Sequence, residues 1–181
     1  MAPILAGAER QEKCIRRRHP CGRCMTMAPS PEPTMPPSTR LAHPEDRARL
    51  LSALAGACAA APLQLAHAVD ALLGHPSQHP CLLVEEGASL VGVAPVSLVP
   101  HLVLGGLVAW LPAGVQVFGG GSRTRDAALA AVGEYARAHG ILHVLLPPAA
   151  LSAADATALG FVPEAGGCWL RAERPTPKSL G

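Results

Sequence analysis

At 181 residues the chain is long enough for one domain of ordinary size and too short for two large ones. Nearly half of its residues are hydrophobic but only 3% are aromatic, so any core must be built from small aliphatic side chains. The formal net charge of +2 is uneven: residues 1–43 hold seven Lys/Arg against three Asp/Glu (+4), which leaves eight against ten (−2) for the rest. The later part is therefore not basic, which argues against nucleic-acid binding by a folded domain there.

The first 43 residues predict a disordered, basic, proline-rich tail. Residues 28–39 contain five prolines and almost no side chain that a core could bury, so nothing would offset the entropy cost of ordering them. A second disordered tail is predicted at 175–181. The first tail holds four possible zinc ligands but a single Cys-x-x-Cys pair, where a zinc knuckle needs two, so we expect no metal. These ligands are Cys14, His19, Cys21 and Cys24.

The remaining cysteines, Cys58, Cys81 and Cys168, are scattered over segments that read as core elements. This scatter predicts reduced thiols and not a disulfide framework, and it favours a cytoplasmic protein. No apolar run precedes a small-residue cleavage site, which argues against a secretory signal.

Two helices are predicted at the start of a domain that we expect to span residues 44–174. The first opens at Pro44 with two acidic residues behind it, as suits a helix N-terminus, and is expected to end near Pro62. The second carries apolar residues at helical spacing and meets a stop signal from Gly74 to Pro76. The two apolar stripes are Leu50, Leu51, Leu54 and Cys58, and Leu65, Val69, Leu72 and Leu73.

Strands are predicted next. Residues 81–86 and 90–99 form two β-type runs joined by a short Gly-containing turn, the pattern of an antiparallel hairpin. Pro95 inside the second run predicts a bulge or an edge position. Further strands are predicted at 102–111 and 115–118, separated by a Pro-Ala-Gly turn.

The clearest helix of the chain is predicted from Thr124 to Gly140, with Leu129, Val132 and Ala136 facing inward. A buried strand at 141–146, a short helix at 152–159 and a final pair of strands within 161–173 follow. This order predicts an α/β (α+β) fold with a mixed, mostly antiparallel sheet and helices on both faces. It excludes a doubly wound dinucleotide fold.

Four segments within 44–174 resemble the GNAT acyltransferase superfamily, in particular the branch related to Fem-type peptidoglycan aminoacyltransferases. They are L-L-V-E-E-G-A-S-L-V-G-V-A-P-V at 82–96, F-G-G-G at 118–121, A-A-L-A-A-V-G-E-Y-A-R-A-H-G at 127–140 and L-G-F-V-P at 159–163. The resemblance implies transfer of an N-acetyl or aminoacyl group to an amine acceptor. The implied donor is an acyl-CoA such as acetyl-CoA or, by analogy with the Fem branch, an aminoacyl-tRNA.

In that family, the turn before the third main helix usually reads Arg or Gln, two residues, Gly, one residue, Gly or Ala. Its backbone N–H groups hold the diphosphate of the donor, because a helix N-terminus presents unpaired donors. Here G-G-G-S-R-T-R-D departs from that spacing but supplies glycines, hydroxyl groups and arginines. The predicted donor-binding residues are Gly119, Gly120, Gly121, Ser122, Arg123, Thr124 and Arg125.

The resemblance assigns no catalytic residue. Many family members carry a Tyr four residues before the Gly of Leu-Gly-Phe, and Ala156 stands there. Tyr135, the only tyrosine, is explained by packing. Gln116 is a weak candidate for orienting an acceptor, although an exposed polar residue in a strand explains it equally well. Glu85 and Glu86 end a strand beside a turn and are expected to face solvent.

Two other interpretations stay open. One is a non-catalytic binding or structural module of the same fold, since the usual phosphate-binding motif and the Tyr are missing. The other is a membrane-associated protein with one hydrophobic span at 88–118, because no Asp, Glu, Lys or Arg occurs between Glu86 and Arg123. The prolines within that range and the strand-length runs between them argue against a span.

Overall fold

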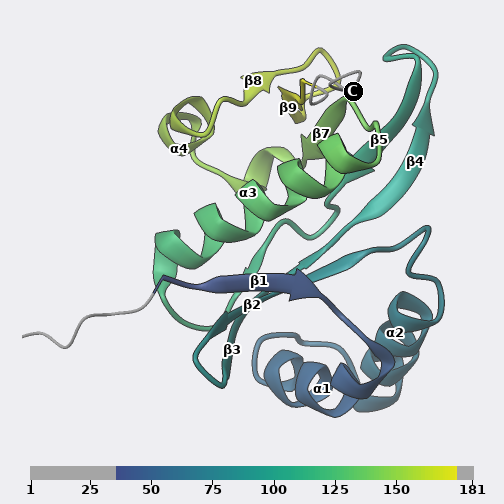
Figure 1. The fold of residues 1–181 in the computed structure, drawn as a ribbon, viewed down its shortest axis with the longest axis vertical. Coiled ribbons are helices and arrows are strands. Elements are labelled where there is room, and N and C mark those ends of the chain that lie inside the picture. The colour runs from purple at the N-terminus through teal and green to yellow at the C-terminus, as the bar shows by residue number, and fades with distance from the viewer. Residues whose placement is uncertain (1–35, 175–181) are drawn as a thin grey trace, which may run out of the picture. The chain divides into compact units, whose positions relative to one another are not determined.

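The computed structural model describes residues 36–174 (Figure 1). The chain divides into two units, residues 1–34 and 35–181, and every described residue lies in the second unit. Residues 1–35 of the predicted N-terminal tail, the predicted tail at 175–181 and the four possible zinc ligands lie outside the described residues.

The first of two sheets has four antiparallel strands in the order β1-β2-β3-β6: β1 (Ser38–Leu41), β2 (Cys81–Glu86), β3 (Ser89–Pro95) and β6 (Gln116–Val117). Strand β1 is a correction to the predicted domain start at residue 44, which leaves it out. Its four residues are too few to show an alternating pattern. They form a strand because they pair with β2, with Ser38 opposite Glu85 and Leu41 opposite Leu82.

Helices cover both faces of this sheet (Figure 1). Helices α1 (Arg47–Ala55) and α2 (Pro62–Gly74) lie on one face, and α3 (Gly121–Ala138) lies on the other. Because side chains alternate along a strand, Leu83 belongs to the core on the α1 and α2 side, whereas Val84 belongs to the core under α3. Helix α1 ends at Ala55, before the predicted end near Pro62, because Gly56 follows it as the C-cap residue.

The second sheet has five strands in the order β4-β5-β7-β9-β8. They are β4 (Ser97–His101), β5 (Gly106–Trp110), β7 (His143–Leu146), β9 (Trp169–Ala172) and β8 (Val162–Pro163). Among the strand pairs of the described residues, only β5 and β7 run parallel. Short helices η1 (Pro44–Asp46), η2 (Pro148–Ala150) and α4 (Ala153–Ala158) complete the domain. The predicted mixed, mostly antiparallel fold class is confirmed.

Two predicted strands are divided differently in the structure. The run at 90–99 breaks after Pro95, and Val96 donates its N–H to Pro80 O at 2.9 Å while the chain passes from β3 in one sheet to β4 in the other. The run at 102–111 begins with a turn, so that β4 and β5 form a hairpin. Gly105 and Gly106, both at positive φ, allow this turn within an apolar stretch.

The alternative interpretation of a membrane span at 88–118 is wrong, because this range contains β3, β4, β5 and β6. Within residues 36–174, no helix combines the length and the apolar character needed to cross a bilayer. Burial explains the apolar pattern only in part: β3 has four buried residues and β4 has none, and Leu102 and Val103 between β4 and β5 are exposed.

The three described cysteines are free thiols, as predicted, but only Cys81 is fully buried. Burial raises the pKa of the Cys81 thiol to about 12, so this side chain behaves as a small apolar core residue.

The chain changes sheet between β5 and β6. Leu111 still donates its N–H to Leu145 O of β7 at 3.1 Å, whereas Val117 of β6 is opposite Gly92 of β3. The turn between them, which includes Gly114 at φ 63°, carries the chain from one sheet to the other. The strand that leads into α3 therefore separates from β7.

An ion-pair cluster fastens β1 to the rest of the domain. The Arg40 guanidinium donates two hydrogen bonds of 2.7 Å to the buried Asp46 carboxylate and two more to Glu85. Arg49 of α1 also pairs with Glu85, at 2.7 Å. These bonds, with Arg40 as the largest cause, hold the pKa of Asp46 far below its usual range. The cluster joins β1, η1, α1 and β2.

Replacing Asp46 with Asn should lower the free energy of unfolding at pH 7 by about 2 kcal/mol, since the charge-assisted bonds from Arg40 are lost. Because the folded-state pKa is depressed, this contribution is complete above about pH 4 and disappears as the pH falls below it. Urea unfolding at pH 7 and pH 3 measures this effect. The difference in the free energy of unfolding between wild type and D46N should be smaller at pH 3 than at pH 7.

D70N is the matched control, because Asp70 pairs with Arg47 on an exposed surface where both side chains are about half exposed. It should leave stability nearly unchanged. Equal losses in D46N and D70N would contradict a special role for the buried carboxylate.

Candidate functional site

The turn from β6 into α3 consists of Phe118, Gly119 and Gly120, and helix α3 begins at Gly121, three residues before the predicted start. Phe118 and Gly119 both donate their N–H groups to Val91 O of β3. Gly120 and Gly121 have φ values of 71° and 57°, a region that residues with a Cβ rarely adopt. Gly120 and Gly121 are thus required by the turn itself, whereas a Cβ at Gly119 would only contact Val91 at 3.5 Å.

The first amide groups of α3 are free to bind a ligand. The backbone N–H groups of Gly121, Ser122 and Arg123 have no acceptor among the described residues, and all three residues are exposed. They lie at the end of the helix that carries positive partial charge. This arrangement can bind an anion.

Thr124 holds the turn from beneath. It is fully buried, and its Oγ1 donates to Gly119 O at 2.8 Å. Its methyl carbon lies against Gly92 of β3, where an added Cβ would approach it to 2.5 Å, and a Cβ on Gly120 would collide with its hydroxyl. The Thr124 hydroxyl therefore serves the turn and does not face the exposed amides.

Both arginines of the predicted site are paired with carboxylates. Arg123 donates to Glu86 Oε1 at 2.6 Å, and Arg125 contacts Asp126 and Asp155, each at 3.1 Å. The pKa of Asp155 is lowered, first by the hydrogen bond from Ser152 and then by the bond from Arg125. Each guanidinium thus shares part of its N–H donors with a carboxylate, although the Arg123 side chain stays 46% exposed.

The expectation that Glu85 and Glu86 face solvent is wrong. Their side chains are 15% and 27% exposed, and each accepts a bond from arginine. Glu86 also lies beside the turn, because its Oε1 would be 3.2 Å from a Cβ on Gly120. A carboxylate thus stands near the free amides, a neighbour that sequence reasoning missed because β2 and α3 are far apart in the chain.

Strands β6 and β7 are not paired, but the gap between them is filled by other parts of the chain. A Cβ on Gly114 would lie 3.1 Å from the Ala150 methyl of η2. The cavity beside this contact measures only about 10 Å³. The Trp169 indole N–H donates to Pro148 O at 3.2 Å and holds η2 in this position.

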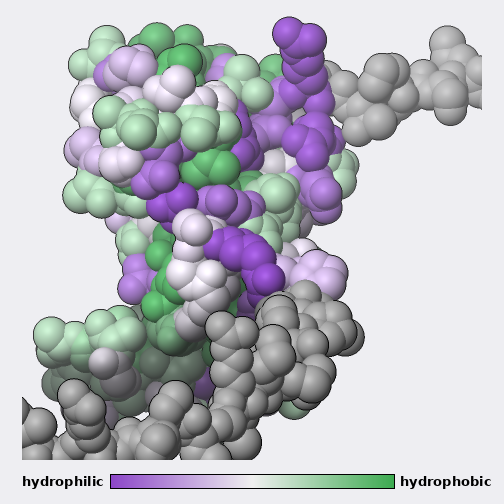
Figure 2. Space-filling model, turned by 90° about the vertical axis from the view of Figure 1, so that its left-hand side faces the viewer, coloured by the Kyte–Doolittle hydropathy of each residue, from purple (hydrophilic) through white to green (hydrophobic). Residues whose placement is uncertain are grey.

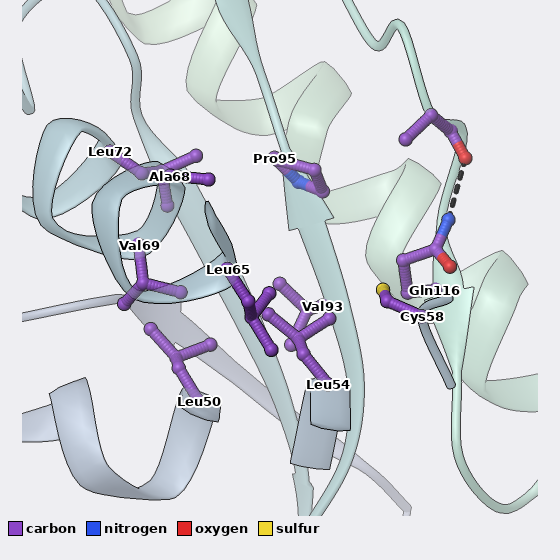
Figure 3. Close-up of a pocket in the computed structure, with 11 residues that line it drawn as sticks. Leu50, Leu54, Cys58, Leu65, Ala68, Val69, Leu72, Val93, Pro95 and Gln116 are labelled. Carbon is purple, nitrogen blue, oxygen red and sulfur yellow. Dashed lines mark hydrogen bonds between the residues drawn. The ribbon is translucent and has the colours of Figure 1, made fainter. Parts of the chain in front are cut away.

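A larger pocket lies on the other face of β6, between α1, α2 and β3 (Figure 3). Its volume is about 300 Å³ and its walls are almost entirely aliphatic. Gln116, the candidate for orienting an acceptor, is half-buried in its wall, and its Nε2 donates to Ala113 O at 2.7 Å. Gln116 therefore lines a pocket in the structure. The sequence pattern, a single polar residue in a strand, did not predict this pocket.

Tyr135 and Ala156 have packing roles. Tyr135 stacks on His139 with ring centroids 4.0 Å apart and packs against the main core. Burial raises the pKa of its hydroxyl group. Ala156 is a fully buried residue of α4. Neither residue lies among those that line the turn or the apolar pocket.

Hydrophilic residues are not separated into one zone. On the face shown in Figure 2, hydrophilic and hydrophobic residues are interspersed, and the surface is hollowed between an upper and a lower part. Each arginine near the turn is matched by a carboxylate. The described residues around the turn thus form no uncompensated basic patch.

Replacing Gly92 with Ala should destabilise the domain by about 2 kcal/mol, because the new methyl group overlaps the Thr124 methyl group. Combining G92A with T124S removes that methyl group, keeps the hydroxyl bond to Gly119 O and should recover much of the loss. Chemical denaturation of the two single variants and the double variant measures this coupling.

G56A is the control, since nothing lies within 4 Å of a Cβ there and its φ is −83°. It should be neutral or slightly stabilising. Strict additivity of G92A and T124S would contradict the close packing of α3 on β3.

No protein-family model and no curated protein matches the sequence. Solved structures do match. The GNAT-family acetyltransferase of Streptococcus pneumoniae has a TM-score of 0.55 and 14% identity over 76% of this chain and 99% of its own.

Two further structures show the same architecture. A GNAT-family N-acetyltransferase of Escherichia coli in complex with CoA gives a TM-score of 0.60 at 13% identity, over 79% of this chain and 84% of its own. A candidate acetyltransferase of Arthrobacter sp. FB24 gives 0.56 at 27% identity, over 72% and 88%. The finer resemblance to the Fem-type branch stays a prediction. The described domain has the fold of the GNAT acetyltransferases.

Proposed function

We propose that this domain transfers an acyl group from an acyl-CoA thioester to the amine of a small acceptor. The observation that carries the proposal is the passage from β6 through two positive-φ glycines into α3, whose first three amides have no acceptor among the described residues. Such an end of a helix suits a diphosphate. A structural neighbour with the same fold is a complex with CoA, which supports this class of donor.

In the transfer, the amine nitrogen attacks the thioester carbonyl carbon, a C–N bond forms and the C–S bond breaks. The amine gives up one proton, and the leaving thiolate takes up one. The donor supplies the activated acyl group, and the protein supplies position. Gln116, with its amide group held by Ala113 O, is proposed to orient the acceptor.

The residues at the turn fit the diphosphate in part. Gly121, Ser122 and Arg123 would hold it through backbone N–H groups and the Ser122 hydroxyl, while Gly119, Gly120 and Thr124 shape the turn beneath. Arg125 would act on the site only indirectly, because it pairs with Asp126 and Asp155. Glu86 opposes the fit, because its negative charge stands beside the same turn and engages Arg123.

The contact between Gly114 and Ala150 also opposes the fit. At this contact the turn before β6 touches η2, and the cavity beside it holds only about 10 Å³, so a CoA arm that entered here would displace η2. Together with Glu86, this contact favours the second candidate function, a non-catalytic module with the same fold. The two functions differ in whether the protein binds an acyl-CoA.

Acetyl-CoA in excess should raise the melting temperature of the wild-type protein, because it binds the native state alone. S122D should abolish this shift, since it places a carboxylate among the free amides. Without ligand, S122D should be at least as stable as wild type, because acidic residues in the first turn favour a helix.

A130D is the matched control, because Ala130 is an exposed residue of α3 beyond its first turn. It should retain the shift caused by acetyl-CoA. Wild-type protein that shows no shift, and no release of CoA from acetyl-CoA with any amine tested, would establish the non-catalytic module instead.

E86Q should bind CoA roughly fivefold more tightly than wild type, since removing one opposing charge and freeing Arg123 contributes about 1 kcal/mol. Titration calorimetry with CoA measures the change. E134Q makes the same change of charge at an exposed position farther along α3 and should bind CoA as wild type does. Unchanged or weaker binding by E86Q would show that Glu86 does not compete with the donor.

A further inference from the structure

The pocket beside Gln116 lies between the consecutive helices α1 and α2 and strands β3 and β6, which come later in the chain. Figure 3 shows Leu54, Leu65 and Val93 converging in it, from the α1, α2 and β3 regions respectively. Side chains from α2 extend the wall, and Pro95 and Ala113 close one side. The residues are Leu50, Leu54, Cys58, Leu65, Ala68, Val69, Leu72, Val93, Pro95, Ala113 and Gln116.

The pocket offers no charge to a ligand. The charged residues of α1 and α2 are paired with one another or with β2: Arg47 binds Asp70, and Arg49 binds Glu85. One N–H of the Gln116 amide is bonded to Ala113 O, which leaves its other N–H and Oε1 for a ligand. A charged group placed here would lose its hydration without gaining an ion-pair partner, so the pocket disfavours ions.

The pocket is open and of useful size. Ala68 is exposed and Leu54 and Leu72 are half-buried, so an apolar hollow persists at the surface. Its volume of about 300 Å³ is at the lower end of the range for small-molecule sites, which are mostly apolar. It has room for roughly ten groups the size of a water molecule, at about 30 Å³ each, and a methylene group is of similar size, so the pocket holds a chain of about ten carbons at most.

The pocket is connected to the donor turn through β6. Gln116 lines the pocket, and the same strand continues through Phe118 into the amides of α3. Strand β6 is an edge strand of its sheet. A ligand whose apolar chain fills the pocket can therefore reach around this edge with its polar end.

From these observations we infer that the pocket holds an uncharged aliphatic chain, and that the acceptor is an alkyl amine of medium length. The role of the ligand as acyl acceptor rests on the proposed function, whereas the binding of an aliphatic chain in the pocket does not depend on it.

Direct binding to the full chain tests the inference with n-alkanols and n-alkylamines whose chains run from well below to just above the roughly ten carbons that the pocket can hold. Affinity for both series should rise about fourfold per added methylene, from about 0.8 kcal/mol each, and then level off when the pocket is full. A68L places a larger side chain in the pocket and should weaken octanol binding at least tenfold. A71L makes the same change at an exposed residue of α2 outside the pocket and should bind octanol normally.

Affinity that does not depend on chain length, or an equal loss in A68L and A71L at unchanged melting temperature, would overturn the inference. A dimer of the ligand-free protein that A68L converts to monomer would also overturn it, because a second copy would then occupy the pocket.

Thiol release from acetyl-CoA separates this inference from the proposed function. If alkanols bind as expected but no alkylamine releases CoA, the pocket assignment stands and acyl transfer fails. If short hydrophilic amines release CoA as fast as octylamine, acyl transfer stands and the aliphatic acceptor fails.

Discussion

The rest of the structure depends on one change of partner. After β5, the chain stops pairing with β7 at Leu111 and crosses to the other sheet. Backbone hydrogen bonds hold β5 against β7, yet six residues later β6 is bonded to β3 in the other sheet. The turn that carries this change needs Gly114. Because β6 separates from β7, the chain can enter α3 at the sheet edge, and the first amides of α3 remain exposed.

At that turn, charge is balanced within the protein. The dipole of α3 favours an anion, while Glu86 and Asp126 already pair with the neighbouring arginines. A GNAT fold thus retains the backbone geometry that can bind a diphosphate, although its side chains are arranged for ion pairs. Whether the site is used depends on the energy difference between those internal pairs and contacts with a donor, which amounts to a few charge-assisted bonds.

The opposite face of β6 has different physical chemistry. The charged residues near this face pair with one another, in the Arg40–Asp46–Glu85 cluster and in the pair between Arg47 and Asp70. The hollow between α1, α2 and β3 is left aliphatic. The scarcity of aromatic residues contributes, because small side chains such as Ala68 and Val93 do not fill the space between helices and sheet. The proposed transfer of an acyl group to an alkyl amine combines these two faces.

Most of the order of helices and strands from residue 44 onward followed from sequence patterns, because periodicity and Gly or Pro signals are local; the run at 90–99 was predicted as one strand and forms two, β3 and β4. The inward residues Leu129, Val132 and Ala136 of α3 were predicted for the same reason and are buried. The turn of Gly119–Gly121 into a helix was also predicted, with the helix start three residues late.

What only the tertiary structure decided depends on contacts between distant residues. Strand β1 exists because β2 pairs with it, and the break after Pro95 reflects the meeting of two sheets. Glu86 meets Arg123 across 37 residues of chain, and Ala150 meets Gly114 across 36. The apolar pocket likewise needs α1, α2 and β3 in place together. Local pattern predicts most of the elements, whereas the contacts at the candidate site depend on side chains that only folding brings together.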